Sequence, residues 1–131
     1  MTLPDEIEHK KDHPSRLMDE QQKYFLPVAF AMIYMRLAEV AKECGYALAL
    51  HGSMRRDLDV VAIPWTEDAV EAEELVRRLL AGSSACLRPN SAIVSKPHGR
   101  RCWMLHLGGG PYIDLSVMPR VTQEQLGISD V

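Results

Sequence analysis

The sequence predicts an α+β fold (an α/β mixed sheet), in which a small mixed β-sheet packs against two main helices. Two amphipathic helix patterns and several short apolar runs follow in the order helix, strand, strand, helix. The last regular segments then predict a strand, a turn and a strand, which together form an antiparallel hairpin. With 131 residues, 47% of them hydrophobic and 25% charged, the chain is long enough for one domain with its own core.

The first helix is predicted from about residue 26 to residue 44. Apolar residues recur there at three- and four-residue steps, Pro27 suits the first turn, and Gly45 suits the C-terminal cap. The preceding residues 1–24 are polar and interrupted by prolines, so we expect an N-terminal arm, either a disordered tail or a short helix laid on the domain. Residues 25–131 are expected to form the single domain.

The remaining elements are predicted from alternating apolar runs and from turn residues. Strands are expected at YALALHGS and at DLDVVAIPW, where Pro64 stops the second strand. A second helix is expected after Thr66, a plausible N-cap, and it should end at Gly82. AIVSK is a candidate short strand, and RRCWMLHL, GGGP and YIDLSVM form the expected hairpin.

Charge and cysteine content exclude some classes of protein. The formal net charge of −3 and the pI near 5.9 argue against tight, salt-driven nucleic-acid binding as the default function. The three cysteines have no CxxC spacing, and Cys44 and Cys102 are expected to be buried thiols, which suits a reducing cytoplasm. No signal peptide and no apolar run long enough for a membrane helix is visible, so a soluble, cytoplasmic protein is expected.

Three aspartates stand within apolar runs that predict strands. Asp57 and Asp59 open DLDVVAI, and Asp114 lies in YIDLSVM between apolar neighbours. Because side chains alternate between the two faces of a strand, Asp57 and Asp59 should share one face, although Asp57 alone would suit a turn. If the two strands are neighbours, Asp114 would join them around one or two Mg²⁺ or Mn²⁺ ions. Metal-assisted phosphoryl or nucleotidyl transfer needs such an arrangement.

The residues just before these aspartates are candidates for phosphate binding. Gly52 has no Cβ, so a phosphate could approach the backbone amides there, and Ser53 adds a hydroxyl group. Arg55 and Arg56 could meet phosphate oxygens, with solvent-exposed turn arginines as the alternative.

Two further places are candidates for substrate contacts. His51 precedes the Gly-Ser pair, and a partly buried, satisfied histidine is the alternative there. The segment KPHGRR holds the basic cluster of Lys96, His98, Arg100 and Arg101, for which ordinary surface charge is the alternative.

HGS after an apolar strand, DLDVV on the next strand and the later YIDLS together resemble the nucleotidyltransferase superfamily, the fold shared by DNA polymerase β and the minimal nucleotidyltransferases. The resemblance covers roughly residues 28–119. It implies a nucleotidyltransferase-like sheet that binds Mg²⁺ and a nucleoside triphosphate such as ATP. By position, Gly52 and Ser53 would hold the β- and γ-phosphates. Asp57 and Asp59 would ligate the metal ions, and Asp114 would ligate one ion and activate the acceptor hydroxyl.

One departure from the family pattern is the connection between Ser53 and Asp57, which has only the three residues MRR. Family members usually carry a longer stretch there that forms a helical turn. The predicted function is Mg²⁺-dependent nucleotidyl transfer, and the alternative is a weakly active or inactive nucleotide-binding module on the same fold. A metal-dependent hydrolase is a weaker hypothesis because no metal-binding histidine motif accompanies the carboxylates. The sequence does not distinguish among a nucleic acid, a protein and a small molecule as the acceptor.

Overall fold

The computed structural model describes residues 14–88, 91–108 and 110–127. The fold is α+β, as the sequence predicts, with a five-stranded mixed sheet and two helices. The elements along the chain are α2 (Pro14–Glu43), β1 (Tyr46–His51), β2 (Leu58–Pro64), α3 (Ala72–Ala81), β3 (Val94–Ser95), a 3₁₀ turn η1 (Pro97–Gly99), β4 (Arg101–His106) and β5 (Tyr112–Val117).

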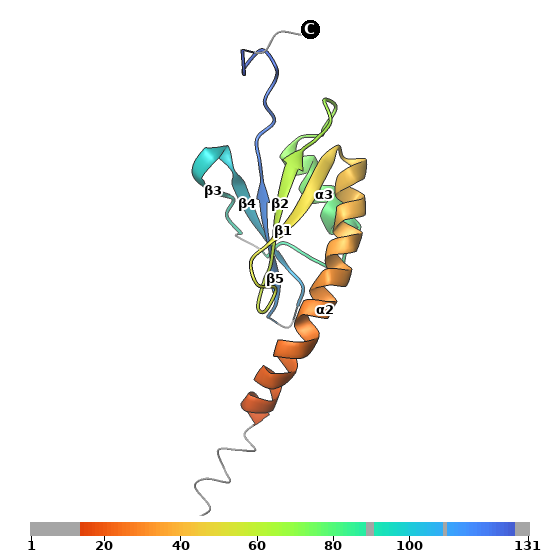
Figure 1. Ribbon diagram of the computed structural model, residues 1–131, viewed down its shortest axis with the longest axis vertical. Coiled ribbons are helices and arrows are strands. Elements are labelled where there is room, and N and C mark those ends of the chain that lie inside the picture. Colours follow the sequence, from red (N-terminus) through yellow and green to blue (C-terminus); the bar gives the residue numbers. More distant parts are fainter. Residues whose placement is uncertain (1–13, 89–90, 109, 128–131) are drawn as a thin grey trace, which may run out of the picture.

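The strands are arranged in the order β1-β2-β5-β4-β3 (Figure 1). Strand β2 pairs antiparallel with β1 and parallel with β5, and β4 pairs antiparallel with both β5 and β3. The predicted strands, the short β3 and the β4–β5 hairpin are therefore confirmed. The parallel pairing makes neighbours of the two strands that carry the aspartates.

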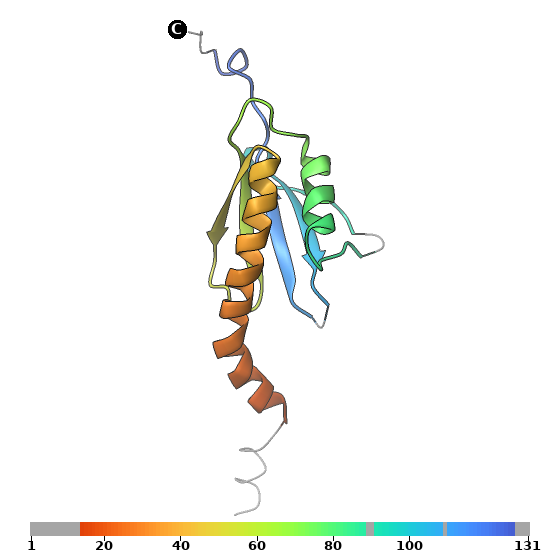
Figure 2. The same cartoon turned by 90° about the vertical axis from the view of Figure 1, so that its right-hand side faces the viewer.

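Both helices cover the same face of the sheet (Figures 1 and 2). Alternate strand residues point toward the helices and form the core, while the intervening residues point to the opposite face. No described helix covers that opposite face, which we call the open face (Figure 2). The fully buried large side chains of the core include Phe30, Leu37, Leu58, Val60, Leu75, Leu79, Leu105, Ile113 and Leu115.

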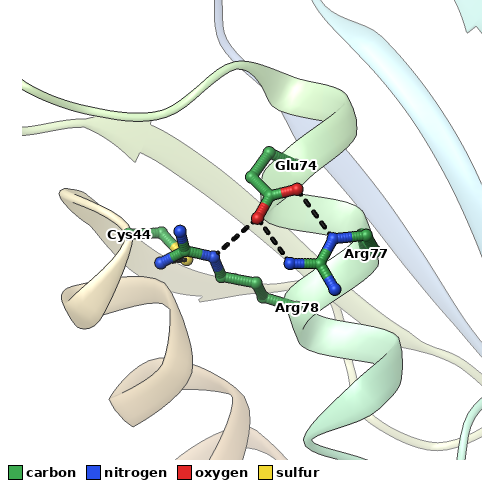
Figure 3. Close-up of polar contacts among 4 residues, drawn as sticks. All are labelled: Cys44, Glu74, Arg77 and Arg78. Atoms are coloured by element: carbon green, nitrogen blue, oxygen red, sulfur yellow. Dashed lines mark hydrogen bonds and ion pairs between the residues drawn. The ribbon is translucent and has the colours of Figure 1, made fainter.

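A polar contact joins the two helices on the covered side of the sheet (Figure 3). The Glu74 carboxylate of α3 accepts hydrogen bonds from Arg77 and Arg78 at 2.6–2.9 Å. The Arg78 guanidinium also lies 3.9 Å from the sulfur of Cys44, just after α2. Burial raises the pKa of the Cys44 thiol, while Arg78 acts in the opposite direction. Cys44 is therefore a buried thiol, as predicted, and marks where α3 meets the end of α2.

The first helix begins earlier than the sequence predicts. It starts at Pro14, so Pro27 lies inside the helix and not in its first turn. The first turn, where a missing N–H costs nothing, is occupied by Pro14. Residues 14–24 of the predicted arm therefore belong to α2, and residues 1–13 lie outside the described part of the chain. The expected C-terminal end is confirmed, since α2 stops at Glu43 and Gly45 follows with a φ of 86°.

The second helix begins later than predicted, because the segment after β2 forms a turn. The Thr66 hydroxyl donates to the Asp68 carboxylate at 2.7 Å, and the Ala69 N–H donates to the Thr66 carbonyl at 3.2 Å. Thr66 therefore closes this turn and does not cap α3. The N-cap position belongs to Glu71, whose side chain makes no capping hydrogen bond.

The predictions for the end of α3 and for the buried thiols are confirmed. Gly82 directly follows α3 as its C-cap. Cys102 is buried like Cys44, whereas Cys86 is exposed, and all three are free thiols. None of the helices in the described ranges has the length and apolar character needed to cross a bilayer.

Candidate functional site

Asp59 and Asp114 lie side by side on the open face of the sheet. The parallel register of β2 and β5 places Asp59 directly beside Asp114, while the flanking Leu58 and Ile113 pair on the covered face. Since residues paired in register point to the same side of a sheet, the two carboxylates face the same space. The two strands that the sequence marked by their aspartates therefore bring these two carboxylates together.

The two aspartates form the middle of a row that crosses four strands. His51 on β1 pairs with Asp59, and Met104 on β4 pairs with Asp114. Both flanking side chains are exposed, and the two carboxylates between them are half-buried. A ligand bound at the carboxylates would therefore have a histidine on one side and a methionine on the other.

The surroundings of Asp59 disfavour the negative charge of its carboxylate. Burial raises the pKa of Asp59, and the neighbouring charges of Asp114 and Asp57 raise it further, while His51 acts in the opposite direction. The carboxylates therefore repel each other across the strand pair. A bound divalent cation would relieve this repulsion, since carboxylate oxygens are its preferred ligands.

The Gly-Ser turn lies directly against the Asp59 carboxylate. Gly52 has a φ of 78°, and a Cβ added to it would lie 2.4 Å from the Oδ2 atom of Asp59. A side chain at position 52 would therefore shift the carboxylate, and the backbone conformation itself favours glycine. The exposed Ser53 follows next in the chain, so its hydroxyl group lies one residue from this contact.

The short connection to β2 forms a series of bends and no helical turn. Met54 has a φ of 57° and packs, half-buried, against the core, which anchors the connection to the domain. Arg55 and Arg56 are exposed between this anchor and β2. The two arginines are thus available to a phosphate at the Gly-Ser turn, but here no helix N-terminus points at one.

Asp57 lies next to Tyr112, just before β2 begins. The register that pairs Leu58 with Ile113 brings the residues that precede them together. A hydrogen bond from the Tyr112 hydroxyl to the Asp57 carboxylate raises the pKa of Tyr112, and burial and the three aspartate charges raise it further. The ring of His106 lies beside Tyr112, with 6.2 Å between the ring centroids.

Tyr112 is the site residue to which the sequence alone assigned no role. Its position two residues before Asp114 places it on the same face of β5 as that aspartate. This alternation was a visible signal, but the hydrogen bond to Asp57 depends on the parallel register of β2 and β5, which no local pattern shows.

The arrangement fits a metal held by two carboxylates. In the described part of the chain, no group of three or more His, Cys, Asp or Glu side chains is arranged to hold a metal ion. The three-carboxylate site expected of Asp57, Asp59 and Asp114 is therefore not formed, and only Asp59 and Asp114 are paired. Magnesium is commonly bound by one or two carboxylates together with substrate phosphates and water, which the paired Asp59 and Asp114 match.

The basic cluster lies away from the aspartates. Arg101 pairs with Val117 at the other end of β5, three positions from Asp114, which corresponds to about 10 Å along the strand. The Arg101 guanidinium lies on the covered face, where it pairs with Glu73 of α3 and lies 5.1 Å from the Trp103 ring centroid.

The other members of the cluster precede β4 at the same end of the sheet. Lys96 and His98 are exposed, and the Arg100 side chain donates to the Pro97 carbonyl at 3.2 Å. The structure therefore brings His51, Gly52, Ser53, Asp57, Asp59 and Asp114 together, and it places Lys96, His98, Arg100 and Arg101 elsewhere.

Comparison of the chain with protein-family models and with curated protein sequences gives no match. The resemblance to the nucleotidyltransferase superfamily therefore depends on the residues described above and on their arrangement.

Proposed function

We propose that the chain is a nucleotidyltransferase that uses Mg²⁺ or Mn²⁺ to move a nucleotidyl group from a nucleoside triphosphate, such as ATP, to an acceptor hydroxyl. The observation that carries this proposal is the in-register pairing of Asp59 and Asp114 beside Gly52. Two adjacent carboxylates next to a glycine would suit a cation together with a phosphate beside it. Its free thiols fit the reducing cytoplasm as the place of action.

Each residue of the proposed site would have its own role in the reaction. Asp59 and Asp114 would hold the metal ion, which when bound would stabilise the charge on the phosphates and on the leaving group. The amide of Gly52 and the hydroxyl of Ser53 would bind phosphate oxygens beside Asp59. Asp114 would accept the proton of the acceptor hydroxyl as its oxygen bonds to the α-phosphorus and pyrophosphate leaves. Asp57 would join the site once its hydrogen bond with Tyr112 breaks.

Part of the open face beside this row is accessible to a substrate. The neighbouring row of the sheet consists of Ala49, Val61, Ser116 and Cys102, all of them small or medium-sized residues. The Ser116 hydroxyl and the Cys102 thiol lie 3.0 Å apart and are buried, so they satisfy each other. The accessible part of this row is therefore Ala49 and the half-buried Val61, and an acceptor could approach the carboxylates from that side.

A second candidate function is a nucleotide-binding module without transfer activity. The bent connection, the engaged Asp57 and the two-carboxylate site favour it. Calorimetry separates the two functions. A transferase should bind the triphosphate more tightly when Mg²⁺ is present, whereas an inactive module should bind it equally well when a chelator removes the metal.

Transfer is tested with nucleoside triphosphates radiolabelled at the α-phosphate, offered with Mg²⁺ and with RNA, protein or small-molecule acceptors. Asp59→Asn and Asp114→Asn should each lower incorporation at least about 100-fold, because each removes a group that stabilises the transition state. Asp68→Asn is the matched control, since it makes the same chemical change in the exposed turn before α3. Parent-like activity in both Asp59→Asn and Asp114→Asn would refute the proposed mechanism.

A further inference from the structure

The outer side of α2 carries a line of exposed apolar side chains, Val28, Met32 and Met35, which we call the α2 stripe. These side chains are 62%, 69% and 67% exposed. They lie at four- and three-residue steps and so share one side of the helix. Phe30 and Leu37, on the other side of α2, are buried in the core. The α2 stripe is therefore largely uncovered, although Met32 also borders a shallow pocket with Ser83 and Leu107 of its own domain.

The N-terminal part of the same helix projects beyond the domain. Residues 14–26 continue α2 past the sheet and past α3, and neither view shows another described element beside them (Figures 1 and 2). This segment is about 20 Å long at 1.5 Å per residue. Since most helical stability in proteins comes from tertiary packing, a surface that packs on this segment would stabilise it.

The register of the α2 stripe continues into the projecting segment. Steps of three and four residues run through positions 18, 21, 25, 28, 32 and 35, which are Met, Gln, Phe, Val, Met and Met. This is the spacing of the core positions in a pair of packed helices. When two copies of α2 run antiparallel, position 18 meets position 35, position 21 meets position 32, and position 25 meets position 28.

We infer that the chain forms a twofold dimer in which residues 14–26 of each copy lie along the α2 stripe of the other. Such a contact is self-complementary, because the same surface occurs on both copies, and it would cover the α2 stripe and the projecting segment at once. A partner of another kind could cover the α2 stripe, but only a second copy brings a projecting segment of matching length and register.

The residues that flank the α2 stripe are compatible with close packing of two copies. Ala29, Ala31 and Ala38 border it, and their small side chains let two helices approach closely. Arg36 also borders the stripe and is ion-paired with Glu39 of its own helix at 3.3 Å. Because α2 covers the face opposite the aspartates, the dimer leaves both open faces free.

Sedimentation of the full chain over a range of concentrations tests the dimer. The parent chain should sediment with twice the mass of the 14.7 kDa monomer. Met32→Glu combined with Met35→Glu should raise the dissociation constant at least about 30-fold, as expected when buried anchor residues are lost. Leu126→Glu is the control, since Leu126 is also exposed but lies far from α2 in the sequence. A monomeric parent, or an unchanged dimer in the double variant, would overturn the inference.

Hydrogen exchange of the unmodified chain provides a test that does not depend on the folding of a variant. Backbone amides of residues 14–26 should exchange slowly at high protein concentration and rapidly after dilution, since dilution separates the copies. Exchange in the core strand β5 should hardly change over the same dilution. If exchange at residues 14–26 does not depend on concentration, a second copy does not cover them.

Discussion

At Gly52 the site depends on the absence of a single carbon atom. Gly52→Ala would force an L-residue to adopt a φ of 78°, at a cost of about 1–2 kcal/mol in the free energy of unfolding. Its Cβ would also push against the Asp59 carboxylate, so we expect metal-dependent nucleotide binding to weaken. Gly108→Ala is a matched control, because Gly108 has a φ of 81° with nothing within 4 Å of the added Cβ. Urea unfolding and calorimetry measure the two effects, and equal loss of binding in both variants would contradict the role of the contact.

We expect the charged Asp59 carboxylate to lower the free energy of unfolding at neutral pH. Since its pKa is raised in the folded state, the folded chain binds this proton more readily than the unfolded chain does. Asp59→Asn should therefore stabilise the protein at neutral pH, by about 0.5–1 kcal/mol. The gain should shrink as the pH falls through the raised pKa, because the parent carboxylate then takes up its proton. Urea unfolding at neutral pH and at about pH 4 checks this, and a gain that persists at low pH would contradict the prediction.

The sequence predicted the acidic residues of the candidate site but not the contacts that the structure gives them. Apolar neighbours mark Asp59 and Asp114 as unusual, and alternation along each strand predicts which side chains share a face. The contact of Gly52 with Asp59 and the hydrogen bond of Tyr112 to Asp57 involve separate segments of chain. Both depend on how strands pair, and pairing is decided by the packing of the whole sheet.

At the scale of single elements, the ion pairs of α3 give a pH-dependent contribution to stability. Hydrogen bonds from Arg77 and Arg78 lower the pKa of Glu74 to about 2 from its usual 4.5. A carboxyl group whose pKa is lowered by folding contributes stability that is complete above the usual pKa and is lost as the pH falls toward the lowered one. Glu74→Gln should therefore be less stable than the parent at neutral pH, and the difference should vanish near about pH 2.

Urea unfolding of the parent and Glu74→Gln across this pH range measures the effect. The exposed Glu67 provides the control, and Glu67→Gln should leave stability nearly unchanged. High salt should reduce the effect of Glu74→Gln, because the contact is open to solvent and is screened by ions. A stability difference that stays constant down to the lowest pH would show that Glu74 acts through packing and not through its charge.

Element types were predictable from periodicity, whereas element boundaries and partners were not. The spacing of apolar residues identifies both helices, but it does not show that α2 extends through Pro27 back to Pro14. Thr66 has the chemistry of an N-cap, yet its hydroxyl is used in a turn and α3 starts at Ala72. Strand β5 comes last in the chain and joins β2, because pairing there buries the apolar side chains of both strands under the helices.

At the scale of the whole molecule, the two faces of the sheet differ: one forms the apolar core, and the other carries the aspartates. The covered face holds the core and both helices, so the amino acids that stabilise the fold are those of the apolar runs. The open face holds the aspartate row, whose carboxylates are tolerated because they remain half-buried. Changes on α2 that alter the oligomeric state should therefore leave the site intact, since the sheet separates the two.

The paired carboxylates on the open face predict how ligands should stabilise the folded chain. A magnesium ion held by these two carboxylates would complete its coordination with water and with phosphate oxygens. Mg²⁺ alone or nucleotide alone should therefore raise the melting temperature little. Together they should raise it by several degrees, because a ligand at 100 times its dissociation constant adds about 2.7 kcal/mol to stability.

Thermal unfolding of the chain with Mg²⁺, with nucleotide and with both together measures this joint stabilisation. Asp114→Asn should abolish the joint effect, since it removes one of the two metal ligands, while Asp68→Asn in the exposed turn should retain it. A chelator added to the complex should return the parent to the stability it has with nucleotide alone. If nucleotide stabilises the chain equally with and without metal, the aspartate row does not act through a cation, and the nucleotide-binding module becomes the better description of this protein.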